Sequence, residues 1–229
     1  MPVSAILLDV GGVLVEPDHP FFAEAFRPFG VKYEPDAFTR GHFAGIAALD
    51  KSAAALGREG WVEYAKAYAR SVGVTGERDV HDVAPHVRGI AGNHYIWCRP
   101  LQPNVDALGK LSRHVPVGIV SNAGGQVENM LRYTGICQVG EGKGTPVACV
   151  IDSHVVGIAK PDPAIFTPAL AAIGLAASTD IIYVGDTVFN DVNGSRAAGL
   201  RPIHLDPYND CRDDSHEHIV ALSELEKLV

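Results

Sequence analysis

The stretch ILLDVGGVLV, from Ile6 to Val15, decides how the rest of the chain is interpreted. An apolar run typical of a buried strand ends in a carboxylate, Asp9, and is followed by two glycines and a second apolar run. Asp9 either supports the glycine turn or is placed there for chemistry. The polar residues that end the other predicted strands help to separate these two interpretations.

Five short apolar runs, rich in Ile and Val, have the length and composition of buried strands: 4–10, 115–122, 147–152, 180–186 and 201–206. Segments with helical patterns separate them and carry glycines near their predicted C-terminal ends: 104–114, 124–135, 163–174 and 190–199. This alternation predicts an α/β fold with a doubly wound, Rossmann-like parallel sheet that is covered by helices on both faces.

The region 17–97 has a different character. It is rich in alanine and aromatic residues at roughly helical spacing, and no convincing strand interrupts it. We therefore predict two parts, a Rossmann-like core formed by 1–16 and 98–229, and an all-helical insertion formed by 17–97.

Composition narrows the classes of function. The chain has 229 residues and a formal net charge of −8, without a cluster of Lys and Arg, which disfavours binding to nucleic acid or to an anionic membrane. The four cysteines are far apart, and no C-x-x-C pair suggests a zinc site or a disulfide framework. The N-terminus does not resemble a signal peptide, and no apolar run approaches the ~18 residues of a membrane span. We expect a cytoplasmic protein without a nucleic-acid or membrane partner.

Polar residues end three of the predicted strands. They are Asp9, the pair Ser121 and Asn122, and Asp186. Each of them could merely support a turn or cap the helix that follows. In an open parallel sheet, however, ligands bind at the carboxyl ends of the strands, so these side chains could converge on a site.

Four motifs together resemble the haloacid dehalogenase superfamily. They are ILLDVGGVLV, VGIVSNA, IAKPDPAIF and VGDTVFNDVNGSRAAGL, which occur in the family's order and span Ile6 to Leu200. The long gap between the first and second motifs lies where this superfamily carries a helical cap. The resemblance implies that the insertion 17–97 is such a cap.

The resemblance also implies a reaction and its residues. Asp9 would attack phosphorus as a nucleophile, Ser121 would donate its hydroxyl to the phosphoryl group, and Lys160 would supply fixed positive charge. Mg²⁺ would be held by Asp9, the Gly11 carbonyl, Asp186 and Asp191, with Asp191 as an outer ligand or as a group that orients a bound water. The groups implied to bind substrate or phosphate are Gly11, Gly12, Ser121, Asn122 and Lys160. The expected activity is that of a Mg²⁺-dependent phosphatase that acts on a small phosphorylated metabolite through an aspartyl phosphate.

One departure from the family pattern affects the chemistry. Most phosphatases of this superfamily carry a second Asp two residues after the nucleophile, which protonates the leaving group, and this chain has Gly11 there. General acid and base catalysis is worth about 10² to 10⁴ in rate. The following segment offers substitute acids, of which Asp18 and His19 are the ones to test.

The missing acid leaves two alternatives open. The chain could be a catalytically weak or inactive binding or regulatory protein that retains the fold. It could also cleave carbon–halogen or carbon–phosphorus bonds, although dehalogenases of the superfamily usually lack the acidic pair that Asp186 and Asp191 form here. A phosphonatase would use a cap lysine, for which Lys32, Lys51 and Lys66 are available.

The C-terminal region carries no assigned function. His216 and His218 are separated by one residue, a spacing that suits a metal on a strand, but an exposed polar loop is the favoured interpretation. The closing segment SELEKLV predicts a short helix that begins near Ser223, with Glu226 in the N3 capping position.

Overall fold

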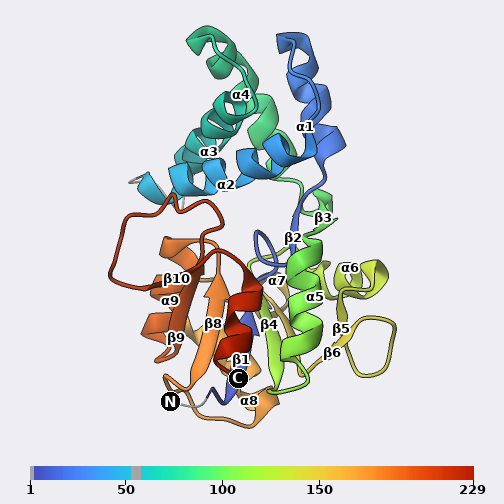
Figure 1. Ribbon diagram of the computed structural model, residues 1–229, viewed down its shortest axis with the longest axis vertical. Coiled ribbons are helices and arrows are strands. Elements are labelled where there is room, and N and C mark those ends of the chain that lie inside the picture. The colour runs from blue at the N-terminus through green and yellow to red at the C-terminus, as the bar shows by residue number, and fades with distance from the viewer. Residues whose placement is uncertain (1–2, 53–57) are drawn as a thin grey trace. The chain divides into compact units, whose positions relative to one another are not determined.

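A computed structural model of the chain describes residues 3–52 and 58–229 (Figure 1). The chain divides into two compact units. The first comprises Met1–Val15, Pro100–Pro207 and Asp213–Val229, and the second comprises Glu16–Arg99 and Tyr208–Arg212. The second unit therefore includes a short excursion, 208–212, from the C-terminal half of the chain. The assignment of the two units as catalytic core and cap stays a prediction.

The first unit contains a parallel sheet of six strands in the order β10-β9-β8-β1-β4-β7 (Figure 1). The strands are β1 (Ala5–Leu8), β4 (Val117–Ser121), β7 (Val150–Asp152), β8 (Ile181–Gly185), β9 (Arg201–Leu205) and β10 (Glu217–Ile219). The α/β fold and all five predicted strands are confirmed. Strand β10 was not predicted, because its three residues are too short and too polar to show a pattern.

Helices cover both faces of the sheet. On one face, Ala5 and Leu7 of β1 pack with Ile165, Phe166 and Ala169 from η3 and α8. On the other face, α5 and the C-terminal η5 lie together (Figure 1). The helices of this unit are α5 (Gln102–Leu111), α6 (Val127–Thr134), α7 (Ser153–Val156), η3 (Pro163–Phe166), α8 (Thr167–Ile173), the π-helical turn η4 (Val188–Val192), α9 (Asn193–Ala197) and η5 (Leu222–Lys227). A separate pair of strands, β5 (Cys137–Val139) and β6 (Thr145–Val147), borders a glycine-rich loop.

The C-terminal helix differs from the prediction. It is a 3₁₀ helix that begins at Leu222, and its capping carboxylate is Glu224 rather than Glu226. The Glu224 side chain accepts hydrogen bonds from the backbone N–H groups of Val220 at 2.8 Å and Ala221 at 3.3 Å. Because the N-cap is Ala221, two residues before Ser223, the N3 position also moves by two residues towards the N-terminus.

The second unit is helical and has its own aromatic core. Its helices are α1 (His19–Phe26), η1 (Arg27–Phe29), α2 (Pro35–Lys51), α3 (Arg58–Ser71), α4 (Glu77–Ala91) and η2 (His94–Ile96), and its ends run through the paired strands β2 (Val15–Pro17) and β3 (Trp97–Pro100). The Tyr68 ring stacks on Phe22 at a centroid distance of 4.8 Å and on Phe26 at 5.6 Å. Such aromatic pairs add to the burial of apolar area.

None of the helices in the described residues is both long enough and apolar enough to cross a membrane.

Helices α2 and α3 approach each other closely at a glycine. A Cβ atom placed on Gly45 would lie 2.5 Å from the Tyr64 ring. That ring is fully buried, and its hydroxyl lies 3.1 Å from Nδ1 of His42. The ring therefore has little freedom to move away, and glycine is required for this contact.

We expect the substitution Gly45→Ala to destabilise the protein. Overpacking of a tight core costs about 1 to 3 kcal/mol, which exceeds the ~1 kcal/mol that alanine gains over glycine in helix propensity. The matched control is Gly89→Ala in α4, where no described atom other than the neighbouring residues and the helix's own backbone lies within 4 Å of the added Cβ, so this variant should gain stability. Urea unfolding of both variants measures the two effects, and a gain of stability in Gly45→Ala would contradict the close approach.

Candidate active site

Three polar residues stand at the carboxyl ends of adjacent strands. Asp9 follows β1, Ser121 ends β4, and Asp186 follows β8. Because β1 lies between β8 and β4 and these strands are parallel, their carboxyl ends meet at one edge of the sheet. The backbone N–H of Asp9 donates to the Val184 carbonyl at 2.9 Å, which fixes the chain beside β8. The structure thus brings these three predicted side chains to the same edge.

Asp9 is buried beside a cation and a hydroxyl. One of its carboxylate oxygens lies 3.0 Å from Nζ of Lys160, and the neighbouring Ser121 hydroxyl also helps to lower the pKa of the carboxylate. Burial raises the pKa of Asp9 above its ordinary value, and the attraction of Lys160 offsets this only in part. The ionised form of Asp9 therefore needs more positive charge than Lys160 alone supplies.

The Lys160 ammonium is held inside the protein by three side chains. Its Nζ lies beside Asp9, donates to Asp191 at 2.6 Å, and donates to the Tyr183 hydroxyl at 2.8 Å. Burial alone would lower the pKa of Lys160, but the carboxylates of Asp191 and Asp9 raise it above its ordinary value. Lys160 is therefore a fixed positive charge at the sheet edge.

Asn122 holds the backbone of Lys160. Its side-chain oxygen accepts a hydrogen bond from the Lys160 N–H at 2.8 Å, and its side-chain nitrogen donates to the Lys160 carbonyl at 3.0 Å. This residue was predicted to bind phosphate. In the structure its side chain positions Lys160 instead, so a contact between Asn122 and a phosphate would have to come from its backbone N–H.

Both oxygens of the Asp191 carboxylate are occupied by protein donors. One accepts from Lys160 and from the Tyr183 hydroxyl, and the other accepts from the backbone N–H and the hydroxyl of Thr187. Burial would raise the pKa of Asp191, but the attraction of Lys160 and the hydrogen bonds from Thr187 lower it below its ordinary value. Direct coordination of a metal by Asp191 would break some of these hydrogen bonds. The arrangement therefore favours Asp191 as an outer group over Asp191 as a direct metal ligand.

The glycine turn after Asp9 makes room for Asp186. Gly12 has a φ of 66°, in the left-handed region that favours glycine. A Cβ atom at this position would lie 1.9 Å from a carboxylate oxygen of Asp186. Any larger residue would therefore displace Asp186 from the edge of the sheet.

The charges at this edge fit a bound Mg²⁺ ion. Asp9, Asp186 and Asp191 are all buried and offer oxygen atoms that lie within 4.8 Å of one another. Lys160 is the buried cation among them, so three carboxylates face one ammonium. A divalent ion that prefers hard oxygen ligands would restore the balance of charge.

The two predicted substitute acids have different surroundings within the helical unit. The His19 side chain is 1% exposed, with Nε2 at 3.3 Å from Glu16 and Nδ1 at 3.3 Å from the Tyr33 hydroxyl. Asp18 is partly exposed and precedes α1 without making a side-chain capping hydrogen bond. Asp18 is therefore the less constrained of the two.

Sequence reasoning missed two residues that hold the site together. Tyr183 bonds Lys160 and Asp191, and Thr187 bonds Asp191. The only signal for Tyr183 was a hydroxyl inside the apolar run DIIYVGD, where a buried tyrosine needs a hydrogen-bond partner. Thr187 gave no signal, because its role depends on the π-helical turn that directs Asp191 back to it.

Comparisons with known proteins agree on the family. The model of the haloacid dehalogenase-like hydrolase family matches residues 3–199. Haloacid dehalogenase-like hydrolase domain-containing protein 3 of Danio rerio is 37% identical over 84 residues, which are 37% of this chain and 31% of that protein. Phosphoserine phosphatase of Thermus thermophilus is 43% identical over 68 residues, which are 30% of this chain and 27% of that enzyme. These matches therefore span about a third or less of the length of the two relatives.

Solved structures share the fold over the whole chain. A HAD-hydrolase of Bacillus subtilis, solved with bound magnesium, has a TM-score of 0.61 at 16% identity and covers 100% of this chain and 99% of its own. A 2-haloacid dehalogenase of Pseudomonas syringae has a TM-score of 0.56 at 20% identity, with 99% and 97% covered. With the family model matching most of its residues, the chain belongs to the haloacid dehalogenase-like hydrolases.

Proposed function

We propose that this protein is a Mg²⁺-dependent phosphatase that hydrolyses a small phosphorylated metabolite through an aspartyl phosphate on Asp9. The observation that carries the proposal is the buried group at the sheet edge, where Asp9 lies 3.0 Å from Lys160 with Ser121 beside it. The residues 1–16 and 98–229 would form the catalytic core, and 17–97 the helical cap that selects the substrate.

Each side chain has a role in the proposed reaction. A carboxylate oxygen of Asp9 forms a bond to phosphorus while the bond to the leaving oxygen breaks, and water later cleaves the aspartyl phosphate. Ser121 and Lys160 bind the phosphoryl oxygens, whose charge they offset. Asp9, the Gly11 carbonyl and Asp186 would hold Mg²⁺, which supplies positive charge for the phosphoryl group, while Asp191 keeps Lys160 in place.

The retained acidic residues favour a phosphatase over a dehalogenase. Asp186 and Asp191 are both buried at the site, although a dehalogenase of this superfamily usually lacks this pair. Phosphoserine phosphatase of Thermus thermophilus and pyrimidine 5'-nucleotidase of Escherichia coli are among the relatives with sequence similarity. Their names refer to small phosphorylated molecules, and this supports a substrate of that class.

The first test is phosphate release from sugar, nucleoside, amino-acid and aryl phosphates with Mg²⁺. We expect turnover of at least one class, its loss on chelation, and a fall of about 100-fold or more in Asp9→Asn, because the amide is not a nucleophile. The control is Asp180→Asn, which changes the same kind of side chain just before β8, at the opposite end from Asp186. Full turnover in Asp9→Asn would contradict the proposed nucleophile.

A second prediction concerns stability without metal. Since burial raises the pKa of Asp9, the ionised carboxylate is disfavoured in the fold. At pH values between the ordinary and the raised pKa of Asp9, the folded protein binds more protons than the unfolded chain. The free energy of unfolding therefore increases as the pH falls through this range and decreases as the pH rises.

The neutral Asp9→Asn variant should therefore have a higher Tm than the natural protein at pH 7 in the presence of a chelator. Mg²⁺ should raise the Tm of the natural protein more than that of the variant. Thermal unfolding followed by circular dichroism measures both effects. A lower Tm for metal-free Asp9→Asn would show that the carboxylate is already well compensated.

A third prediction tests Asp18 as the acid that replaces the residue missing at position 11. Asp18→Asn should reduce the turnover of alkyl phosphates by about 10² to 10⁴, since an alkoxide leaving group needs a proton. Turnover of an acyl or nitrophenyl phosphate, whose leaving groups are stable as anions, should change little. Asp36→Asn in α2 is the matched control. An equal loss of turnover with both kinds of substrate would show that Asp18 is not the acid that protonates the leaving group.

A further inference from the structure

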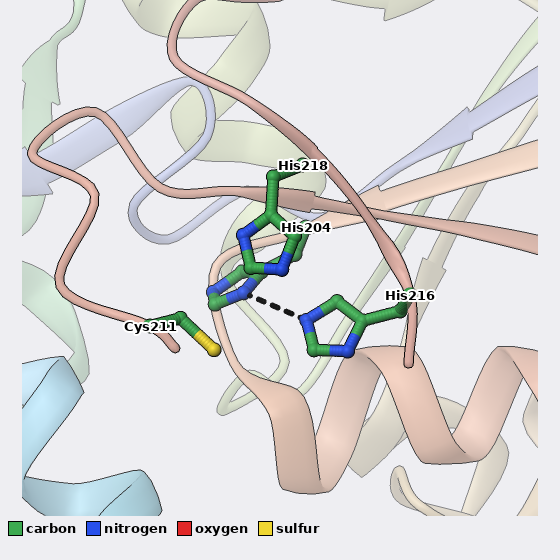
Figure 2. A group of neighbouring side chains, drawn as sticks. All are labelled: His204, Cys211, His216 and His218. Carbon is green, nitrogen blue, oxygen red and sulfur yellow. Dashed lines mark hydrogen bonds between the residues drawn. The ribbon is translucent and has the colours of Figure 1, made fainter. Parts of the chain in front are cut away.

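A second cluster of side chains that could bind a metal lies around strands β9 and β10 (Figure 2). His204 of β9 and His218 of β10 are paired residues in the parallel register. His216 precedes His218 by two residues and so lies on the same side of the chain. The ring centroids of the three histidines are 4.4 to 5.3 Å apart.

The cluster is largely shielded from solvent. His204 is 5% exposed, the His216 side chain is 0% exposed, and the His218 side chain is 26% exposed. One ring nitrogen from each of the three lies within 4.8 Å of those from the others. Three imidazoles that lie together with little or only partial exposure are unusual for a polar loop, because each could be solvated outside the protein at lower cost.

Hydrogen bonds determine which nitrogens carry protons. Nε2 of His204 lies 3.0 Å from the carbonyl oxygen of Asp186, and Nε2 of His218 lies 2.9 Å from the carbonyl oxygen of Asp213. A carbonyl oxygen only accepts, so each Nε2 must be the donor. In both neutral rings the lone pair is therefore on Nδ1. Metal-binding histidines commonly donate their other ring N–H to a carbonyl or carboxylate in this way.

The spacing of the nitrogens matches two ligands of one ion. Nδ1 of His204 lies 3.2 Å from Nε2 of His216 (Figure 2). Two imidazole nitrogens that bind one tetrahedral Zn²⁺ at about 2.0 to 2.1 Å are separated by roughly 3.4 Å. In the ion-free protein a proton on His216 bridges this gap. Transfer of that proton to Nδ1 of His216, which lies 3.7 Å from the Asp213 carboxylate, would free the lone pair on Nε2 of His216. Nδ1 of His204 and Nε2 of His216 could then both bind the ion.

The surroundings also suit a cation. Burial, with His218 and His204 nearby, lowers the pKa of His216 to about 4, and burial lowers the pKa of His204. These rings are therefore neutral at pH 7 and can act as ligands. The carboxylates of Asp206 and Asp213 lie 4.0 and 3.7 Å from ring nitrogens of the cluster, and they add negative charge around it.

We propose that His204, His216 and His218 form a binding site for a transition-metal ion of the Zn²⁺ class, in addition to the proposed Mg²⁺ site. Imidazole ligands favour Zn²⁺ and related ions over Mg²⁺, which prefers oxygen. The ion would link β10 to β9. By fixing the His204 ring, it would also stabilise the hydrogen bond from Nε2 of His204 to the backbone carbonyl of Asp186. Cys211, also drawn in Figure 2, belongs to the excursion 208–212, and the three imidazoles define the site without it.

The test is a Zn²⁺ titration of the full chain, prepared without a polyhistidine tag, by competition with a chromophoric chelator in excess Mg²⁺. We expect one tight equivalent per chain. His218→Gln and His216→Gln should each weaken binding by at least about tenfold, since each removes a ligand. His114→Gln, which changes an exposed histidine of the same unit, should bind like the natural protein. Far-UV circular dichroism of the chelated proteins shows that the variants are folded.

Two further variants separate this site from its rivals. Zn²⁺ binding retained in Asp9→Asn and in Cys211→Ser, but weakened in His218→Gln, supports the three-histidine site. Binding lost in Asp9→Asn and kept in the histidine variants would assign the ion to the carboxylates. Binding lost only in Cys211→Ser would assign it to the thiol, and the absence of a tight equivalent in the natural protein would show that there is no such site. Each of these last three results overturns the proposal.

Discussion

The burial of the Lys160 ammonium is the constraint on which the candidate site depends. An ammonium on a lysine that is 3% exposed is costly unless charged and polar partners replace its water. Asp191 and Tyr183 supply these partners from the β8 side, and Asp9 supplies the third from β1. Because the partners come from β8, from η4 and from the end of β1, the ammonium also fixes these side chains relative to one another. The same contact that permits burial thereby orients the proposed nucleophile.

The structure separates the groups that position this charge from the groups that are available for chemistry. Asn122 uses its side-chain oxygen and nitrogen on the Lys160 backbone, and Asp191 uses both carboxylate oxygens on protein donors. Asp9 differs from them, because burial raises its pKa while Asp191 has a lowered one. Of these two neighbouring carboxylates, Asp9 is the one whose charge is less compensated. An added cation therefore stabilises the ionised form of the residue that would act as the nucleophile.

The sequence predicted those parts of the fold and site that depend on local pattern. Buried strands with polar ends are visible as apolar runs, so Asp9, Ser121 and Asp186 could be placed at one edge before the structure was known. The partners of Lys160 could not be predicted in this way, because they depend on side-chain direction and on the π-helical turn at Asp191. His204 was hidden for a similar reason. It lies 12 residues before His216 and meets it only because the short strand β10 pairs with β9.

The histidine cluster and the acidic site are connected through one backbone carbonyl. Asp186 directs its carboxylate towards the glycine turn after Asp9, and its carbonyl accepts the Nε2 proton of His204. Rotation of the Asp186 peptide would break this hydrogen bond and leave a buried acceptor without its donor, which costs about 1 to 3 kcal/mol. Whatever fixes the His204 ring therefore also restricts Asp186. A site that must hold several carboxylates against their mutual repulsion benefits from such a restraint. The free energy needed to bring the carboxylates together is then supplied by folding and not by substrate binding.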